Sequence, residues 1–346
     1  MKLTQLKGEM IKMQAFKALV VNKQEDQFSV QLQEKTLQEL PKGEVLIRVH
    51  YSGVNYKDSL ATIPDGNIVN TYPIIPGIDL AGVVVSSEDA QFQEGDEVIA
   101  TSYEIGVSHF GGYSEYARIP AKWIVPLPEG LTLKDAMTIG TAGFTAALSV
   151  QRLEENGVSP ESGKVLVTGA TGGVGSFAVS ILSTLGYQVE ASTGKASEQA
   201  YLEKLGASSI VSREEVYDGK VRALAKQKWV AAVDPVGGEP LASLLSQIQY
   251  GGSVATSGLT AGTKLPATVF PFILRGINLL GIDSVYCPMD TRLKVWNRLA
   301  TDFKLENLDG LIQQEITLQQ LPDVLPTLLK GQARGRTIVN ILEGND

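Results

Sequence analysis

A glycine-rich loop between an apolar segment and a helical segment constrains the fold more than any other feature of this chain. The loop, "VTGATGGVG" (167–175), follows a short apolar run at 164–169 and precedes a helical pattern at 174–186. Such a loop is typical of proteins that hold a dinucleotide pyrophosphate at a helix N-terminus, where free N–H groups and a partial positive charge attract phosphate. Gly172 would let the backbone approach the phosphate, and Gly175 would let the helix pack closely on the strand. A tight turn without a ligand also uses glycine, so the neighbouring pattern has to decide.

The pattern around the loop alternates strand-like and helical segments from about residue 136 to residue 285. Helical segments at 197–206 and 239–250 separate several short apolar runs. Five of these runs are expected to be strands: 188–193, 208–211, 231–236, 252–258 and 278–285. Strands that alternate with helices of this length predict a parallel, doubly wound α/β sheet, which is the context that the glycine-rich loop requires.

The first part of the chain differs, with short β segments separated by glycine and proline from residue 15 to about residue 130. This pattern predicts an irregular β-barrel-like domain. The clearest segments are rich in valine, isoleucine and tyrosine: 44–54, 81–87, 96–102 and 113–120. After residue 286 the chain has one further helical segment, at 291–303, and β-like pieces that end at "GRTIVNIL" (335–342).

Composition argues against several classes of function. A net charge of −8 makes non-specific nucleic-acid binding a poor hypothesis. The single cysteine, Cys287, excludes an intramolecular disulfide and a cysteine-rich zinc site. The longest apolar run, 269–282, is interrupted by polar residues and is too short to span a membrane, and the first residues contain no long apolar signal segment. We therefore expect a cytoplasmic protein that binds neither nucleic acid nor membrane.

The end of the second predicted strand of the α/β region decides which nicotinamide cofactor the loop would hold. A protein that takes NAD places an acid there to bind the ribose 2′-OH, and Glu190 is the one acid in "QVEAST" (188–193). Counting back from the next turn places the strand end at Ser192–Thr193. Glu190 then lies too early in the strand to reach the ribose.

The residues that would face the 2′ position are Ser192, Thr193 and Lys195. Hydroxyl groups and an ammonium suit a phosphate dianion, so we predict NADPH as the cofactor. Arg213, just after the third strand, would stack on the adenine or add positive charge. Two alternatives stay open: Lys195 as a solvated turn lysine, and a strand end displaced by two residues, which would return the ribose to Glu190.

Stretches spread along nearly the whole chain resemble the medium-chain dehydrogenase/reductase superfamily, and within it the zinc-free, quinone oxidoreductase-like YhdH/YhfP group. The matching stretches are "SGVNYKDSLA" (52–61), "YPIIPGIDLAGVVVSS" (72–87), "GDEVIATSYEIGVS" (95–108), "GTAGFTAALSV" (140–150), the glycine-rich loop, "PFILRGINLLGIDSVYCPMD" (271–290) and "GRTIVNI" (335–341). The resemblance implies a GroES-like catalytic domain made from both chain ends, with a Rossmann NADP-binding domain inserted. The expected ranges are 1–135 and 286–346 for the catalytic domain and 136–285 for the Rossmann domain.

The resemblance also implies an activity, because the group is similar to NADPH-dependent acrylyl-CoA reductases, which reduce the double bond conjugated to a thioester. An NADPH-dependent quinone or enone oxidoreductase is the alternative within enzymology. A third possibility is a catalytically silent NADPH-binding structural or sensor protein. Zinc alcohol dehydrogenases of the superfamily place a cysteine ligand near Asn55 and a His–Glu pair near Asp79–Leu80, and this chain has neither. We therefore expect hydride transfer without a metal.

The resemblance carries roles onto individual residues. Tyr56 in "NYKD" would lie beside the nicotinamide, either as a proton donor or as a packing residue, and Asn55 would donate a hydrogen bond to substrate or ribose. Leu259 would cover the nicotinamide ribose, and Ile273 and Ser284 would line the nicotinamide, with core packing as the alternative for Leu259 and Ile273. The complete set expected to bind cofactor is Tyr56, Thr171, Gly172, Gly173, Val174, Gly175, Ser192, Thr193, Lys195, Arg213, Leu259, Ile273, Ser284, Gln332 and Arg336.

The segment "LLGIDSVY" (279–286) resembles the edge strand through which dimers of the superfamily join their sheets. An apolar edge strand left uncovered is an aggregation hazard. We therefore expect a homodimer whose substrate is a small acyl-CoA or a quinone.

Overall fold

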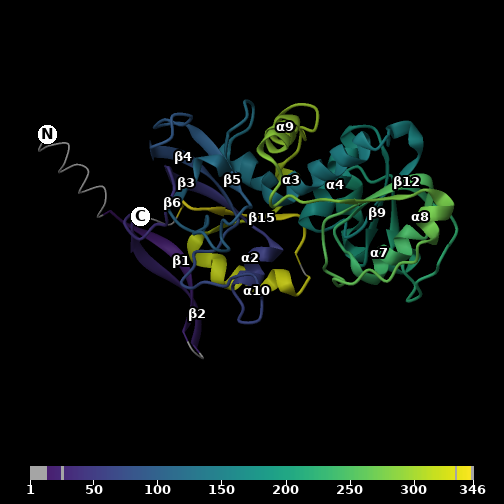
Figure 1. Cartoon of the computed structure of the whole chain (residues 1–346), viewed down its shortest axis with the longest axis horizontal. Coiled ribbons are helices and arrows are strands. Elements are labelled where there is room, and N and C mark those ends of the chain that lie inside the picture. Colours follow the sequence, from purple (N-terminus) through teal and green to yellow (C-terminus); the bar gives the residue numbers. More distant parts are fainter. Residues whose placement is uncertain (1–13, 25–26, 332, 344–346) are drawn as a thin grey trace, which may run out of the picture. The chain divides into compact units, whose positions relative to one another are not determined.

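The computed structural model describes residues 14–24, 27–331 and 333–343, and it divides into two compact units. The first unit falls within residues 1–141, 288–293 and 308–346, and the second comprises residues 142–287 and 294–307. The second unit is therefore inserted into the sequence of the first. Figure 1 shows the consequence inside the first unit, where elements from the end of the chain (yellow) lie among elements from its beginning (purple and blue).

The first unit is built from two β-sheets. A two-stranded sheet pairs β1 (Ala15–Gln24) with β2 (Gln27–Thr36) in antiparallel register. A seven-stranded sheet has the order β14-β15-β3-β4-β5-β7, with β6 paired to β3. Its strands are β3 (Val45–Val54), β4 (Asp79–Ser87), β5 (Glu97–Thr101), β6 (Tyr116–Ile119), β7 (Ile124–Pro126), β14 (Ile312–Thr317) and β15 (Arg336–Asn340). Among the described residues, the α-helices that lie wholly within this unit are α2 (Tyr56–Ala61) and α10 (Leu321–Leu329).

The last strand completes the sheet that the first part of the chain begins. β15 lies between β14 and β3, pairing in parallel with the former and antiparallel with the latter. Ile338 and Val339 of this strand are fully buried. The apolar residues of β3 join the same core, since Val45, Leu46, Ile47 and Val49 are all buried in it. The end of the chain thus lies in the same sheet as β3 and β4 from its first part.

The second unit contains a six-stranded parallel sheet in the order β10-β9-β8-β11-β12-β13. Its first strand in sequence lies near the centre and the chain winds outward in both directions, which is the doubly wound arrangement that the sequence predicted. The strands are β8 (Lys164–Val167), β9 (Gln188–Thr193), β10 (Ser209–Ser212), β11 (Trp229–Asp234), β12 (Ile248–Thr256) and β13 (Asn278–Gly281). The helices are α4 (Gly173–Thr184), α5 (Gln199–Lys204), α6 (Arg213–Val216), α7 (Gly238–Leu245) and α8 (Phe270–Arg275).

Two longer helices, α3 (Leu133–Glu155) and α9 (Met289–Ala300), each contain one point where the chain passes between the units; the chain also passes between them after Cys287 and after Asn307. Short 3-10 turns fill some connections: Ala121–Trp123, Pro160–Ser162, Ala196–Glu198, Asp309–Leu311 and Leu318–Gln320. Helix α3 is kinked at Gly140, whose φ of 48° and ψ of −158° are not helical. The chain leaves the first unit one residue after this kink.

One predicted helix is too long. The segment 239–250 was expected to be helical, but α7 ends at Leu245 and β12 already begins at Ile248. Ile248 is fully buried and pairs with Trp229 of β11. The burial of this side chain against the neighbouring strand outweighs the helical pattern, and Gly251 (φ 72°) then redirects the chain.

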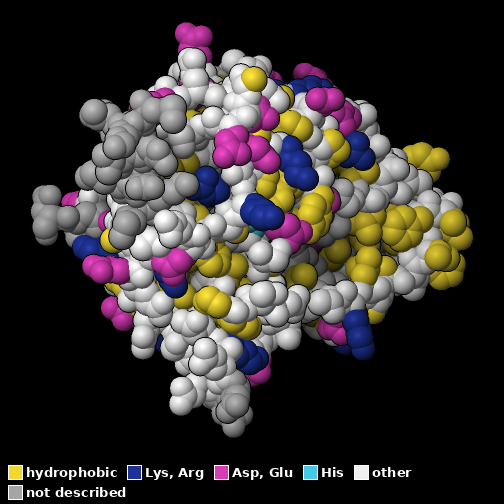
Figure 2. All heavy atoms as spheres, turned by 60° about the vertical axis from the view of Figure 1, so that its left-hand side comes forward, with side chains coloured by type: hydrophobic (Ala, Val, Ile, Leu, Met, Phe, Trp, Pro, Cys, Tyr) yellow, Lys and Arg dark blue, Asp and Glu magenta, His cyan; other side chains and the backbone are white. Residues whose placement is uncertain are grey.

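Among the described residues, no helix combines the length and the apolar character needed to cross a bilayer. On the face drawn in Figure 2, basic and acidic side chains are interspersed and do not gather into a patch of one sign. This face offers no stripe of positive charge of the kind that a nucleic-acid backbone requires.

Candidate active site and cofactor loop

The glycine-rich loop connects β8 to α4 at the carboxyl end of the sheet. A side chain at Gly175 would place its Cβ only 2.3 Å from the carbonyl oxygen of Gly169, so α4 can approach the loop only with glycine there. A Cβ at Gly172, the N-cap of α4, would lie 3.4 Å from the same oxygen, an ordinary contact. The packing of the chain therefore requires glycine at position 175 but not at position 172. Glycine at 172 is explained instead if the backbone there must approach a phosphate closely.

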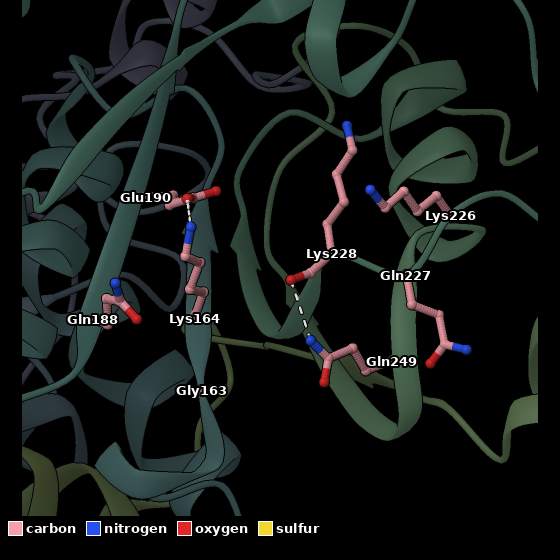
Figure 3. A pocket seen from close by; sticks show the side chains of 8 residues that line it. All are labelled: Gly163, Lys164, Gln188, Glu190, Lys226, Gln227, Lys228 and Gln249. Atoms are coloured by element: carbon pink, nitrogen blue, oxygen red, sulfur yellow. Dashed lines mark hydrogen bonds and ion pairs between the residues drawn. The ribbon is translucent and has the colours of Figure 1, made fainter.

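Glu190 lies inside β9, and its carboxylate forms its hydrogen bonds at the amino ends of the strands, opposite to the glycine-rich loop. It accepts hydrogen bonds from Lys164 Nζ (2.6 Å), Trp229 Nε1 (2.7 Å) and Ser209 Oγ (3.1 Å). Burial alone would raise the pKa of Glu190, but these bonds outweigh burial and lower it. Figure 3 shows Glu190 pointing toward Lys164 beside a hollow of about 500 Å³ that is lined by residues at the amino ends of the strands.

The predicted strand end is confirmed, because β9 finishes at Thr193. The glycine-rich loop is tied to this end, since the Ala170 N–H donates to the Ser192 carbonyl (3.1 Å). Two cations follow. The guanidinium of Arg213 lies over Gly194, where a Cβ would come within 2.6 Å of Arg213 Nε. The pKa of Lys195 is lowered, chiefly by burial; the charge of Glu198 opposes this effect, and the charge of Arg213 adds a smaller lowering effect.

The remaining candidates for cofactor binding fall into three groups. Leu259 and Ile273 are 57% and 69% exposed, so the alternative of core packing is wrong for both. Ser284 is buried, and its hydroxyl accepts a hydrogen bond from Thr145 Oγ1 (2.8 Å). Gln332 lies outside the described residues. Arg336 lies in the first unit, in a network described below.

Tyr56 is the first residue of α2, and its side chain is 43% exposed. The helix has only six residues, and its N-cap is Asn55, whose backbone is extended (φ −122°, ψ 158°). Asp58 holds this first turn in place, since its Oδ2 accepts a hydrogen bond from the Asn55 N–H (2.9 Å). Asp58 is fully buried, so its carboxyl group belongs to the interior of the first unit.

A buried network of charged and polar groups stands behind this turn. Asn55 Nδ2 donates to Asp79 Oδ2 (2.8 Å) and to Asp58 Oδ2 (3.2 Å), and Asn55 Oδ1 accepts from Arg336 Nη1 (3.0 Å). Arg336 Nη2 forms an ion pair with Asp79 Oδ2 at 3.7 Å. Asp79 also accepts from the Thr141 N–H (2.9 Å) and hydroxyl (2.5 Å) at the kink of α3.

The guanidinium of Arg336 has no nitrogen left for a cofactor. Nε donates to the Thr138 carbonyl (3.0 Å), and Nη1 donates to the Val54 carbonyl (3.1 Å) as well as to Asn55. Nη2 contacts the Met137 carbonyl (3.4 Å) in addition to Asp79. Arg336 was predicted to bind the cofactor, but its guanidinium has no free donor with which to do so.

Two carboxyl groups and one guanidinium share this buried volume, so one negative charge is in excess when both acids are ionised. Burial, reinforced by the charge of Asp79, raises the pKa of Asp58 to about 6. Burial lowers the pKa of Arg336, and the neighbouring carboxylates Asp79 and Asp58 oppose that effect. Near pH 6 and below, Asp58 binds a proton and the network becomes neutral.

Zinc does not fit these residues. Among the described residues, no three His, Cys, Asp or Glu side chains come together in a group that could hold a metal ion. The positions where zinc members of the superfamily place ligands hold Asn55 and Asp79, and the cation that contacts Asp79 here is Arg336. Zinc also prefers nitrogen and sulfur donors, which this network lacks.

Comparisons with known proteins agree with this architecture. Residues 41–129 match the family model for the alcohol dehydrogenase GroES-like domain, and residues 173–301 match the model named zinc-binding dehydrogenase. YhfP of Bacillus subtilis, which bears the provisional name of a quinone oxidoreductase, is 60% identical over 94% of this chain and 99% of its own length. The chain belongs to the medium-chain dehydrogenase/reductase superfamily. Like the rest of the family group that it matches, it is an oxidoreductase.

Solved structures place the chain more closely within this family. The crystal structure of YhfP with NAD bound has a TM-score of 0.93 and covers 95% of this chain and 100% of its own. The YhdH oxidoreductase of Salmonella enterica, in complex with NADP, has a TM-score of 0.91 at 46% identity and covers 94% of this chain and 99% of its own. The acrylyl-CoA reductase AcuI of Ruegeria pomeroyi is 49% identical over 94% of this chain and 99% of its own length.

The raised pKa of Asp58 predicts how stability depends on pH. The folded protein holds the Asp58 proton up to about pH 6, whereas the unfolded chain releases it near pH 3.8. Ionised Asp58 therefore destabilises the fold above pH 6, and this cost disappears as the pH falls toward 4. Relative to Asp58→Asn, the wild-type protein should gain roughly 1 kcal/mol of unfolding free energy between pH 8 and pH 5. Urea unfolding of both proteins at each pH measures this, and a change of opposite sign would contradict a raised pKa.

Proposed function

We propose that this oxidoreductase uses NADPH to reduce the activated C=C bond of a short enoyl thioester, with acrylyl-CoA as the simplest such substrate. The observation that carries the substrate class is the 49% identity to AcuI over 94% of the chain. The described residues contain no cluster of metal ligands. This is consistent with the proposed chemistry, because a double bond conjugated to a carbonyl is activated by that carbonyl and needs no metal.

The residues that would hold the cofactor lie in the second unit. The loop Thr171–Gly175, comprising Thr171, Gly172, Gly173, Val174 and Gly175, would bind the pyrophosphate through backbone N–H groups at the start of α4. Ser192, Thr193, Lys195 and Arg213 would bind the 2′-phosphate, since they place hydroxyls and two cations at the end of β9. Leu259, Ile273 and Ser284 would contact the nicotinamide half, a role that rests on family resemblance.

The chemistry divides between cofactor and protein. Bound NADPH supplies a hydride to the β-carbon of the acceptor. The electron pair of the double bond moves onto the thioester carbonyl, and a proton must then reach the α-carbon to give the saturated product. The phenol of Tyr56 is the exposed donor that we assign to this proton, or to a hydrogen bond that stabilises the carbonyl oxygen as negative charge develops.

A quinone or enone reductase is the second candidate. The 60% identity to YhfP, whose provisional name is quinone oxidoreductase, favours it. A quinone also accepts hydride at a conjugated system without a metal, so the residues of the first unit suit both acceptors. The third possibility, a catalytically silent NADPH-binding protein, would not require the exposed Tyr56 phenol to act on an acceptor.

An acceptor panel tests the proposal. NADPH oxidation is followed with acrylyl-CoA, a longer enoyl-CoA and a benzoquinone, for the wild-type protein and Tyr56→Phe. We expect the highest kcat/KM with acrylyl-CoA. We also expect a loss of about 10²-fold in kcat for Tyr56→Phe, the scale of general acid catalysis by one side chain.

Each other result selects a different conclusion. Faster turnover with benzoquinone would establish the second candidate. Tight NADPH binding without oxidation by any acceptor would identify a silent binding protein. Unchanged turnover in Tyr56→Phe would limit Tyr56 to a packing role.

The cofactor preference has its own test, which matters because NAD occupies the YhfP crystal structure. The double variant Thr193→Asp/Lys195→Ala removes one cation and adds an acid at the end of β9. It should lower the kcat/KM ratio of NADPH to NADH by about 100-fold, since hydrogen bonds to charged groups are worth about 1.5–3 kcal/mol each. Lys204→Ala, an exposed lysine at the end of α5, is the control and should leave the ratio unchanged. An unaltered ratio in the double variant would refute 2′-phosphate binding here.

We also propose that the protein is a homodimer joined at the edge of the second unit's sheet. β13 is the last strand of that sheet, and the preceding helix α8 exposes Phe270 and Leu274 beside it. Exposed apolar side chains next to an unpaired strand edge are typical of an interface.

Light scattering tests this proposal. The wild-type protein should have the mass of two chains at micromolar concentration, and Leu274→Asp should shift it toward one chain because it places a charge on the apolar surface. Tyr250→Asp changes an apolar side chain that is 79% exposed elsewhere and should keep the wild-type mass. A monomeric wild-type protein would contradict the assembly.

A further inference from the structure

The orientation of the Asn55 amide is dictated by its partners. The guanidinium of Arg336 can only donate hydrogen bonds, so the Asn55 atom that faces it must be the acceptor Oδ1. The carboxylates of Asp58 and Asp79 accept hydrogen bonds, so the Asn55 atom that faces them must be the donor Nδ2. Both Nδ2 hydrogens are therefore used inside the protein. For Asn55 to donate a hydrogen bond to a substrate, one of these bonds would have to break.

The guanidinium of Arg336 joins three segments that are distant in sequence. It contacts Val54 and Asn55, where β3 passes into α2, the strand β4 at Asp79, and the turn of α3 before its kink at Thr138. Because a guanidinium is planar with donors in fixed directions, these contacts define an orientation as well as a position. A point charge at the same place would not do so.

The space around the Arg336 guanidinium is too small for a side chain at either of two neighbouring glycines. A Cβ at Gly53 would lie 2.5 Å from Arg336 Nη2, and a Cβ at Gly140 would lie 2.7 Å from the same atom and 2.6 Å from Asp79 Oδ2. Two glycines thus make the space for the ion pair, and Gly140 also accepts the kinked backbone that lets Thr141 face Asp79.

Helix α2 depends on this anchor. Six residues are too few for a helix to be stable by its own hydrogen bonds. Its direction must come from tertiary contacts, namely packing against α10 and the buried bonds at its N-cap. Tyr56 immediately follows the N-cap, so a rotation of Asn55 moves Tyr56 directly.

We propose that Arg336 is a positioning residue for the reaction: by fixing the Asn55 amide between Asp79 and Asp58, it sets the first turn of α2 and thereby the place of the Tyr56 phenol. This inference rests on the proposed role of Tyr56. It assigns Asn55 to positioning and no longer to substrate binding.

The variant Arg336→Lys tests the inference because it keeps the buried positive charge and removes the planar fork. NADPH affinity should change little, since the residues proposed to bind the pyrophosphate and the 2′-phosphate lie in the second unit. The kcat with the best acceptor should fall about 10- to 100-fold, the range expected when a reacting group is displaced by about 1 Å. Arg298→Lys, in which the side chain pairs with Glu154 and Asp302, is the matched control and should leave kcat unchanged.

A readout that does not need activity follows the phenol itself. Proteins labelled with 3-fluorotyrosine are compared by ¹⁹F NMR, with the resonance of Tyr56 assigned by its loss in Tyr56→Phe. Arg336→Lys should shift or broaden this resonance, and Arg298→Lys should not. If Arg336→Lys fails to fold, the double variant Arg336→Met/Asp79→Leu, which removes both charges together, takes its place with the same expected results.

The outcomes separate this inference from the proposed function. A folded variant at Arg336 with wild-type kcat and an unchanged Tyr56 resonance overturns the positioning role. If the wild-type protein reduces no acceptor, the proposed function fails, while the Tyr56 resonance still decides whether Arg336 positions α2. A Tyr56 resonance that moves together with a fall in kcat and constant NADPH affinity supports both.

Discussion

The ion pair between Arg336 and Asp79 is the constraint on which the first unit depends. Asp79 is fully buried and Arg336 nearly so, and the two residues come from strands β4 and β15, more than 250 positions apart in sequence. Gly53 and Gly140 have no side chain because the pair occupies that space. The kink of α3, the start of α2 and the insertion of the last strand beside β3 all follow from satisfying these two groups.

Such a pair is a weak source of stability. Removing two charges from water costs several kcal/mol for each ion, and apolar replacements of similar volume are often neutral or stabilising. The network here is nevertheless extensively hydrogen-bonded, since Asn55, Thr141 and several carbonyls occupy the sites that the pair leaves open. A satisfied polar network specifies one arrangement of its neighbours. In this chain that arrangement includes the short helix that carries Tyr56.

Local patterns made much of the fold predictable. The glycine-rich loop, the alternation of strands and helices, and the end of β9 at Thr193 each depend on a short window of sequence. The predicted helix at 239–250 was wrong at its end because Ile248 pairs with Trp229, a contact that no local pattern reveals. The network was missed for the same reason. The signal available in the sequence was an acid inside the apolar stretch 74–85 and an arginine at the start of the last strand, but neither names its partner.

The relatives do not by themselves decide the cofactor, because YhfP was crystallised with NAD and YhdH with NADP. The position of Glu190 is a stronger argument for NADPH over NADH. To grip a ribose at the carboxyl end of β9, its carboxylate would have to leave Lys164, Trp229 and Ser209, all at the amino edge. Hydrogen bonds to a charged group contribute about 1.5–3 kcal/mol each, so one ribose contact would replace several interactions of equal strength. The residues already at the strand end are hydroxyls and cations, and an anion beside them would stabilise the charged form of Lys195, whose pKa is lowered chiefly by burial and to a smaller extent by Arg213.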